Sequence, residues 1–286
     1  MSSISYFAEC TVLITGASAG LGREFARQLA PVVSTMVLVA RRHERLETLA
    51  LELKVINPDL ELFSRPVDLG NEADLKRFAD WLDESGLAID LLVNNAGLGD
   101  QGPFVDGQWD RIEAMLRVNV YALTYLTYRI LPRMQKAGCG AILNVSSVAS
   151  FLPVPNMGVY AATKAYVTSF SEALRAELRG VNISVTTLCP GPVLTEFSDV
   201  AHRTTGSEAK APEAFLVPVQ DVVRDALNGV ARDRARVVPG ALVNLVMTLV
   251  AFVPMFIKRL VYQVQLNEPS RATRESERNY ETTVAR

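Results

Sequence analysis

A serine, a tyrosine and a lysine have the types and spacing of an acid–base group. Ser147 follows an apolar run, Tyr160 lies thirteen residues later, and Lys164 lies four residues beyond Tyr160. Residues four apart share one face of a helix, so we expect the ammonium beside the phenol. A nearby cation lowers a tyrosine pKa from about 10 toward neutrality. Tyr160 is therefore a candidate to exchange a proton with a carbonyl or hydroxyl oxygen that Ser147 also binds, although such a pair is commonly a packed ring beside a solvated amine.

A glycine-rich segment, T-G-A-S-A-G-L-G over residues 15–22, comes directly after an apolar run and before a helical pattern that starts at Arg23. Glycines allow a tight turn and a close approach of backbone N–H groups to a pyrophosphate, and the following helix offers its positive dipole end. The G-x-x-x-G-x-G spacing differs from G-x-G-x-x-G, so it predicts a variant dinucleotide site. An ordinary strand–helix turn is the alternative.

The residues after the second apolar run indicate which dinucleotide is bound. Ala40 stands where an Asp or Glu would hold the ribose hydroxyls of NAD, and Arg41 and Arg42 follow. A guanidinium matches the charge and geometry of a phosphate. We therefore expect Arg41, with Arg42 sharing the role, to bind the 2′-phosphate of NADP; the alternative is that both arginines begin a solvated helix.

Short apolar runs alternate with amphipathic stretches along the chain, which is typical of repeated βα units. Such units imply a parallel sheet covered by helices on both faces. No linker interrupts the first 235 residues. We predict an α/β fold with a doubly wound parallel sheet, a Rossmann fold, in one domain. The expected strands are Thr11–Thr15, Met36–Ala40, Asp90–Asn94, Ala141–Ser146, Ser184–Leu188 and the short Arg236–Val238.

Composition excludes several classes of protein. The 286 residues carry 29 basic and 31 acidic side chains, a balance that does not favour nucleic-acid binding. The three cysteines are far apart without a CxxC pair, which argues against disulfides and a zinc site, and only two histidines are present. We expect no metal and a cytoplasmic location. The first ten residues lack the pattern of a secretory signal, so export is not expected.

Near the C-terminus, residues 237–257 form a run of 21 residues without a charge, divided by Pro239, Gly240, Asn244 and Pro254. A helix near residues 241–253 could cover the core, pair subunits or enter a bilayer interface; a true membrane span is the least favoured. We assign residues 1–266 to the domain, with 237–262 as an apolar helical extension, and 267–286 to a polar, solvated tail. Peripheral membrane contact through 241–257 is one open outcome.

The chain resembles the short-chain dehydrogenase/reductase family over about residues 8–240, in the NADP-dependent branch that includes bacterial broad-range carbonyl reductases and hydroxysteroid or 3-oxoacyl reductases. The matching motifs occur in the family's order. They are Thr15–Gly22, Asp68-Leu69, Asn94-Asn95-Ala96-Gly97, Asn119 in R-V-N-V, Ser147, Tyr160 with Lys164, and Pro190-Gly191.

The resemblance implies a catalytic tetrad of Asn119, Ser147, Tyr160 and Lys164. Tyr160 would protonate the substrate oxygen, Ser147 would orient it, Lys164 would bind the ribose and lower the tyrosine pKa, and Asn119 would position a water. It also implies NADP(H) as cofactor and a homodimer or homotetramer joined through the helices of Asn119 and Tyr160. The implied cofactor-binding residues are Gly16, Ser18, Gly20, Leu21, Gly22, Arg41, Asp68, Leu69, Asn95, Ala96, Gly97, Tyr160, Lys164, Pro190, Gly191 and Val193.

Substrate choice is expected to depend on three segments, residues 98–105, 151–157 and 193–215. They are rich in apolar side chains, which favours a small lipophilic carbonyl compound or alcohol. The apolar candidates are Phe104, Phe151, Leu152, Val154, Met157, Phe197 and Phe215. We therefore expect NADPH-dependent reduction of a lipophilic ketone or aldehyde. The alternatives are reduction of 3-oxo chains bound to an acyl carrier, and a non-catalytic NADP-binding module that docks on a partner or membrane.

Overall fold

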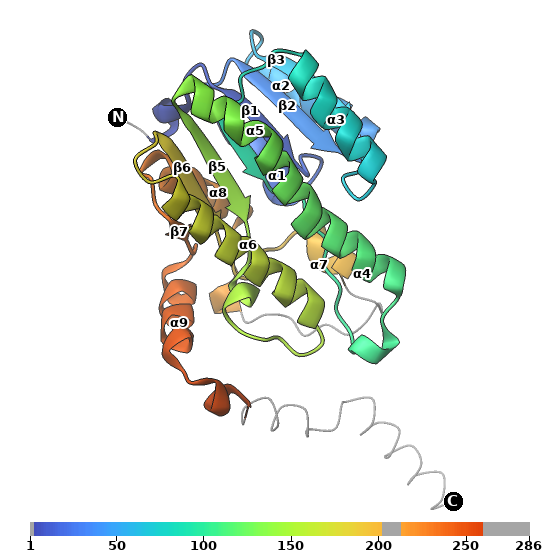
Figure 1. The fold of residues 1–286 in the computed structure, drawn as a ribbon, viewed down its shortest axis with the longest axis vertical. Helices are drawn as coiled ribbons and strands as arrows, with labels where there is room; N and C mark the ends of the chain where they lie inside the picture. Colours follow the sequence, from blue (N-terminus) through green and yellow to red (C-terminus); the bar gives the residue numbers. More distant parts are fainter. Residues whose placement is uncertain (1–2, 202–212, 260–286) are drawn as a thin grey trace, which may run out of the picture. The chain divides into compact units, whose positions relative to one another are not determined.

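Seven parallel strands form one sheet in the computed structural model, which describes residues 3–201 and 213–259 (Figure 1). The spatial order is β3-β2-β1-β4-β5-β6-β7, so the direction of strand addition reverses between β1 and β4. The carboxyl ends of two such strands border the crevice where doubly wound sheets bind ligands. The predicted fold is confirmed. The strands are β1 Thr11–Thr15, β2 Thr35–Ala40, β3 Glu61–Pro66, β4 Leu91–Asn94, β5 Gly140–Val145, β6 Ile183–Leu188 and β7 Arg236–Val237.

Helices cover both faces of this sheet (Figure 1). One core lies under α1, α2 and α8 and includes Val12 and Ile14, whereas the other lies under α3, α5 and α6 and includes Leu13. Successive residues of a strand point to opposite faces, so an uninterrupted apolar strand serves both cores. The helices are α1 Gly20–Leu29, α2 His43–Ile56, α3 Glu72–Glu84, α4 Trp109–Leu116, α5 Leu123–Ala137, α6 Gly158–Glu177, α7 Glu196–Ala201, α8 Val219–Ala231 and α9 Ala241–Phe252.

The strand β3 is absent from the set of strands predicted from the sequence. It pairs only with β2 and forms an edge of the sheet, and none of its residues is fully buried. Its side chains pack instead on one ring of α3: the Phe63 and Trp81 ring centroids are 5.7 Å apart, and the Arg65 guanidinium lies 3.6 Å from the Trp81 centroid. An edge strand of this kind needs no apolar run, which explains why periodicity missed it.

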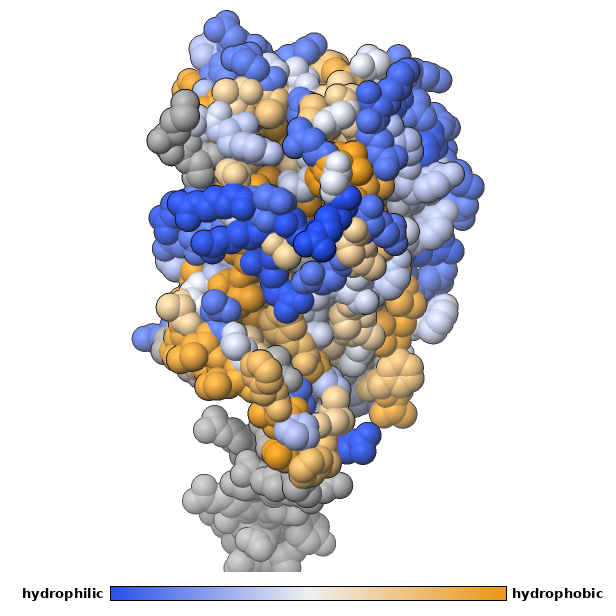
Figure 2. Space-filling model, turned by 60° about the vertical axis from the view of Figure 1, so that its left-hand side comes forward, coloured by the Kyte–Doolittle hydropathy of each residue, from blue (hydrophilic) through white to orange (hydrophobic). Residues whose placement is uncertain are grey.

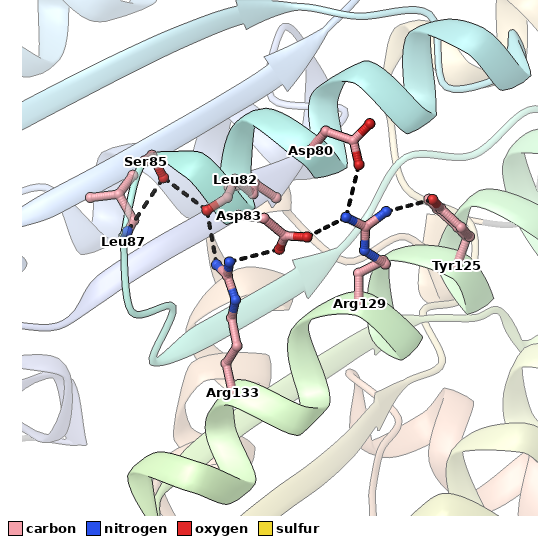
Figure 3. Close-up of polar contacts among 8 residues, drawn as sticks. All are labelled: Asp80, Leu82, Asp83, Ser85, Leu87, Tyr125, Arg129 and Arg133. Atoms are coloured by element: carbon pink, nitrogen blue, oxygen red, sulfur yellow. Dashed lines mark hydrogen bonds and ion pairs between the residues drawn. The ribbon is translucent and has the colours of Figure 1, made fainter.

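Two arginines of α5 fasten this helix to α3 (Figure 3). Arg129 forms ion pairs with Asp80, at 2.9 Å, and with Asp83. Arg133 pairs with the same Asp83 at 2.7 Å, and Arg129 also donates a hydrogen bond to the Tyr125 hydroxyl. Several charges in one network hold a helix better than an isolated surface pair does. This network therefore fixes the position of α5, and with it the end of the helical segment that precedes α5.

The chain divides into two compact units, Met1–Met247 and Thr248–Arg286. The first unit holds all seven strands of the described sheet. The predicted domain end at residue 266 and the predicted tail, 267–286, lie outside the described residues and stay predictions.

The apolar run 237–257 forms the short β7 and then α9. Val243 is buried at 2 % exposure, but a row of apolar side chains at spacings of three and four residues is exposed. Figure 2 shows hydrophobic side chains gathered in the lower part of its view. Within the described ranges, no helix has the length and apolar character needed to cross a membrane. The exposed row is Leu242, Leu245, Leu249 and Phe252.

Candidate active site

The glycine turn lies between β1 and α1 and depends on the absence of side chains. Gly16 and Gly20 have φ values of +68° and +51°, in the left-handed region that glycine adopts most readily. A Cβ on Gly22 would lie 2.2 Å from the Gly16 carbonyl oxygen. No side chain caps the N-terminus of α1, so the first backbone N–H groups of the helix remain available as donors. This geometry fits the pyrophosphate of a dinucleotide.

The segment after β4 is hydrogen-bonded to this turn. Asn95 Nδ2 donates to the Thr15 carbonyl oxygen at 2.9 Å, and Thr15 Oγ1 accepts the N–H groups of Asn95 and Ala96, both at 3.0 Å. A Cβ on Gly97 would lie 3.3 Å from Lys164 Nζ. The N-N-A-G motif thus joins the glycine turn on one side and approaches the lysine on the other.

The end of β2 presents arginines and no carboxylate. Ala40 is buried there, and Arg41 and Arg42 are exposed. The Arg42 guanidinium reaches back to the glycine turn, where its Nη2 and Nε lie 3.3 and 3.4 Å from Ser18 Oγ. A phosphate on the adenosine ribose would meet cations here, which fits NADP and disfavours NAD.

Asp68 and Leu69 follow β3 at the same edge of the sheet. Asp68 Oδ1 accepts the N–H of Gly70 at 2.9 Å, which fixes the loop. Leu69 is buried and lines, with Thr15 and Ala96, a cavity of about 10 Å³. The structure therefore brings Leu69 to the start of the glycine turn.

Asn119 lies in a π-helical turn, Arg117–Ala122, inserted between α4 and α5. Its Oδ1 accepts the Leu98 N–H at 2.8 Å, and its Nδ2 donates to the Leu98 carbonyl at 2.9 Å and to Thr163 Oγ1 at 3.0 Å. Both the oxygen and the nitrogen of the amide are therefore hydrogen-bonded, to the loop after β4 and to α6. Widened helical turns of this kind are frequent at functional sites.

Tyr160 and Ser147 meet at the carboxyl end of β5. The Ser147 hydroxyl lies close enough to the phenol to lower the pKa of Tyr160, and Ser147 Oγ accepts the Ala149 N–H at 3.1 Å. Tyr160 is buried, and this burial raises the pKa of its phenol to about 12, while the Ser147 hydroxyl acts in the opposite direction. Tyr160 therefore carries its proton at neutral pH.

Lys164 lies one helical turn from Tyr160 and is also buried. Its Nζ donates to the Val145 carbonyl at 2.9 Å and lies 5.8 Å from the centroid of the Tyr160 ring. Burial lowers the pKa of Lys164 to about 8. The pKa of Tyr160 is thus raised on balance, because loss of water disfavours the charged phenolate; the lowering expected from Lys164 does not prevail, and the catalytic role of the lysine stays a prediction.

The segment after β6 lies across from the glycine turn. Pro190 and Gly191 follow the strand, and Val193 packs against the core under α1 and α8. A Cβ on Gly20 would lie 3.4 Å from Thr195. Thr195 is a candidate cofactor contact that the sequence analysis missed; its only signal is a hydroxyl residue five positions after Pro190.

The apolar residues predicted to contact substrate do not all lie at the site. The Phe197 ring lies 5.7 Å from the Tyr160 ring and covers it. Phe104 is 72 % exposed in a short 3-10 turn, so it does not line an enclosed pocket in this structure. Residues 202–212, part of the predicted substrate segment, lie outside the described residues.

Other features of the described chain lie away from this edge. A cavity of about 350 Å³ borders β7 and α8 and is lined by Arg232, Arg234 and Arg236 among others, but by no predicted site residue. Among the residues with described positions, no group of three or more His, Cys, Asp or Glu side chains could hold a metal ion.

Comparison with known proteins identifies the family. Residues 10–205 match the family model described as short chain dehydrogenase. Sulfoacetaldehyde reductase 2 of Chromohalobacter salexigens is 38% identical over 206 residues, which are 71% of this chain and 80% of that protein.

Solved structures agree with this match. A short-chain dehydrogenase from Sphingobium yanoikuyae in complex with NADPH superposes with a TM-score of 0.76 at 32% identity, covering 92% of this chain and 97% of that one. The bulky-bulky ketone specific alcohol dehydrogenase from Comamonas testosteroni gives a TM-score of 0.71 at 30% identity, with 92% and 96% covered. The chain belongs to the short-chain dehydrogenase/reductase family of oxidoreductases.

Proposed function

We propose that this chain reduces a lipophilic ketone or aldehyde to the alcohol, with NADPH as reductant and Tyr160 as proton donor. The observation that carries the proposal is the burial of Tyr160 with Lys164 one helical turn away, 5.8 Å from the ring centroid, at the sheet edge that also holds the glycine turn. The protein is an NADP-dependent oxidoreductase that acts on CH–OH groups, and NADP(H) is its cofactor.

The residues of the crevice have distinct tasks in holding this cofactor. The glycine turn offers backbone N–H donors to the pyrophosphate, and the arginines after Ala40 offer positive charge to the 2′-phosphate. Lys164, whose Nζ lies beside Gly97, is placed to hold ribose hydroxyls. When bound, NADPH supplies the hydride that the carbonyl carbon receives.

The proton comes from Tyr160. Its hydroxyl and that of Ser147 converge, so both can hydrogen-bond a carbonyl oxygen, and Tyr160 transfers its proton as negative charge develops there. The Lys164 ammonium stabilises the resulting phenolate across the short distance to the ring. Asn119 acts as a positioning residue through its bonds to Leu98 and Thr163.

Two observations support a lipophilic substrate. The Phe197 ring covers Tyr160, so the carbonyl would meet an aromatic wall beside the proton donor. The Comamonas relative, whose name states specificity for bulky ketones, matches nearly the whole of this chain.

A panel of ketones and aldehydes, assayed by the absorbance of NADPH, tests the proposal. We expect turnover of aryl and long alkyl ketones and weak turnover of charged small aldehydes. Binding of NADPH without oxidation by any panel member would favour a non-catalytic NADP-binding module. A marked preference for a 3-oxoacyl chain on its carrier protein over the free ketone would favour the acyl-carrier alternative.

We also propose a homodimer or homotetramer formed through the helices that carry the tetrad. Exposed aromatic side chains gather there: Tyr121 lies in the π-helical turn, Tyr128 on α5 is 71 % exposed, and Tyr166 lies on α6. The Thr124 and Tyr166 hydroxyls, 2.9 Å apart, join the two helices into one surface. Light scattering should give a multiple of the chain mass, and Tyr128→Glu should lower it; a monomeric wild type would contradict the proposal.

For the exposed row of α9 we propose contact with an anionic membrane surface from the cytoplasmic side. The row Leu242, Leu245, Leu249 and Phe252 would enter the apolar layer, and the cations Lys258 and Arg259, which follow the helix, would meet anionic headgroups. The protein should sediment with phosphatidylserine vesicles, and Leu245→Glu should release it. Absence of sedimentation, or an α9 variant that alters only the oligomer mass, would contradict membrane contact.

A further inference from the structure

The helix α7 connects the two ends of the crevice through its side chains. Glu196, its first residue, contacts the arginines at the adenosine end, and Phe197 covers Tyr160 at the substrate end. We propose that Glu196 is a specificity-determining residue that competes with the 2′-phosphate of NADP for Arg42. This inference rests on the NADP dependence stated above.

The Glu196 carboxylate occupies the position of an anion between two guanidinium groups. Its oxygens lie 2.7 and 2.8 Å from Arg45 Nη1, and its Oε2 lies 3.1 Å from Arg42 Nη1. These bonds, first that from Arg45 and then that from Arg42, lower the pKa of Glu196 and keep it charged. Arg45 is thus the nearer partner of Glu196, and the longer contact between Glu196 and Arg42 is the one more easily broken.

Arg42 already reaches the glycine turn. Its other guanidinium nitrogens lie 3.3 and 3.4 Å from Ser18 Oγ in the glycine turn, while Nη1 is given to Glu196. A phosphate brought into the crevice offers more acceptors and more charge than one carboxylate oxygen. Arg42 therefore exchanges Glu196 for the 2′-phosphate, whereas Glu196 keeps its pair with Arg45.

The competing contact has a consequence for α7. The C-terminal end of α7 is held by the Ala201 carbonyl, which accepts the Gln101 N–H at 2.9 Å, and Phe197 packs near Gly99. Loss of the Arg42 contact removes one of the ties between α7 and the end of β2. NAD lacks the 2′-phosphate, so it leaves this tie in place. Cofactor identity is thereby read by the same helix that covers Tyr160.

Binding of 2′,5′-ADP and 5′-AMP, followed by calorimetry, tests this competition because the two probes differ only in the 2′-phosphate. Glu196→Gln should tighten 2′,5′-ADP binding about two- to fivefold, the range expected for an exposed ion pair, and leave 5′-AMP unchanged. The KM for NADPH should fall by a similar factor. In an Arg42→Gln background, Glu196→Gln should give no gain.

The matched control is Glu172→Gln. It removes the same charge and breaks a Glu–Arg pair with Arg236 of 2.7 Å that lies outside the crevice. Unchanged or weaker 2′,5′-ADP binding in Glu196→Gln, or an equal gain in the control, would overturn the competition while the NADP dependence stands. A wild type that binds both probes equally would overturn the competition and the assignment of the arginines to the 2′-phosphate together.

Discussion

The glycine turn and α7 face each other across the crevice but are specified in different ways. The turn is held by backbone contacts: Gly22 has no room for a Cβ, and Asn95 binds main-chain oxygen. The helix α7 is held by side chains, the exposed Glu196 pairs and the Phe197 ring. A turn that depends on backbone geometry tolerates few substitutions, whereas the side-chain contacts of α7 can be altered one residue at a time. The glycine turn is therefore the constrained region, and α7 is the adjustable one.

The largest expected effect comes from the residue that both regions serve. Tyr160→Phe removes the proton donor and should lower kcat about 1,000-fold, the middle of the range for general acid catalysis. NADPH affinity should stay within about twofold, because the ring still fills its site. A steady-state assay of NADPH oxidation measures kcat, and a fluorescence titration with NADPH measures the affinity. Retention of more than a few per cent of activity would count against the mechanism.

The second-largest effect is expected from a substitution that distorts the glycine turn. Gly22→Ala places a Cβ 2.2 Å from the Gly16 carbonyl oxygen, so the turn must shift. We expect cofactor affinity to fall about 100-fold, because the displaced N–H groups lose one or two hydrogen bonds to a charged phosphate, each worth about 1.5 to 3 kcal/mol. Gly158→Ala is the control, since its Cβ meets nothing within 4 Å. Equal NADPH affinity in the two variants would show that the turn is not the pyrophosphate site.

The arginines at the end of β2 are tested by the preference for NADP over NAD. Arg41→Asp puts a carboxylate beside the 2′-phosphate position and should weaken NADP binding about 10- to 100-fold, with NAD less affected. Arg179→Asp, an exposed charge reversal on the loop after α6, is the control. An unchanged NADP to NAD preference would refute a phosphate role for Arg41.

The pH dependence tests the buried pair. Lys164 has a pKa of about 8, so it loses its charge as pH rises through that value, while Tyr160, at about 12, keeps its proton. The kcat/KM for reduction should be level below pH 8 and fall above it, by about tenfold per unit, because the phenolate loses its counter-charge. A rate of reduction that rises between about pH 8 and 10 would contradict these roles.

The smallest effect is expected from α7, the adjustable region. Phe197→Ala removes the ring over Tyr160 and should raise KM for an aryl ketone about three- to tenfold, as one apolar contact does. The KM for NADPH should be unchanged. An equal rise in both constants would mean that α7 supports the whole crevice and that the two regions are not separable.

The fold and the glycine turn could be predicted from the sequence because each depends on patterns among residues close together in the chain. The apolar runs located six of the seven strands within one residue at either end, and glycines located the turn. The edge strand β3 was missed because its side chains pack on Trp81 without being buried. The Glu196 pairs were missed because their partners are about 150 residues apart in the chain, beyond any local pattern.

The raised tyrosine pKa was also beyond prediction. Spacing placed Lys164 beside Tyr160, but spacing says nothing of how much water reaches either group. Their burial follows from the packing of α6 on β5 and on the segment before α5, which only the assembled chain provides. Desolvation then outweighs the charge that the sequence placed nearby.

The widened turn at Arg117–Ala122 amounts to one surplus residue within a helix that otherwise continues from α4 into α5. Removing a single amino acid there would restore ordinary i to i−4 bonding and rotate everything upstream by about 100° relative to α5. Asn119 would then swing away from Leu98 and Thr163. A deletion that makes the helix regular would thus remove the link between the loop after β4 and α6. The π-helical turn is what allows the Asn119 side chain to bind both.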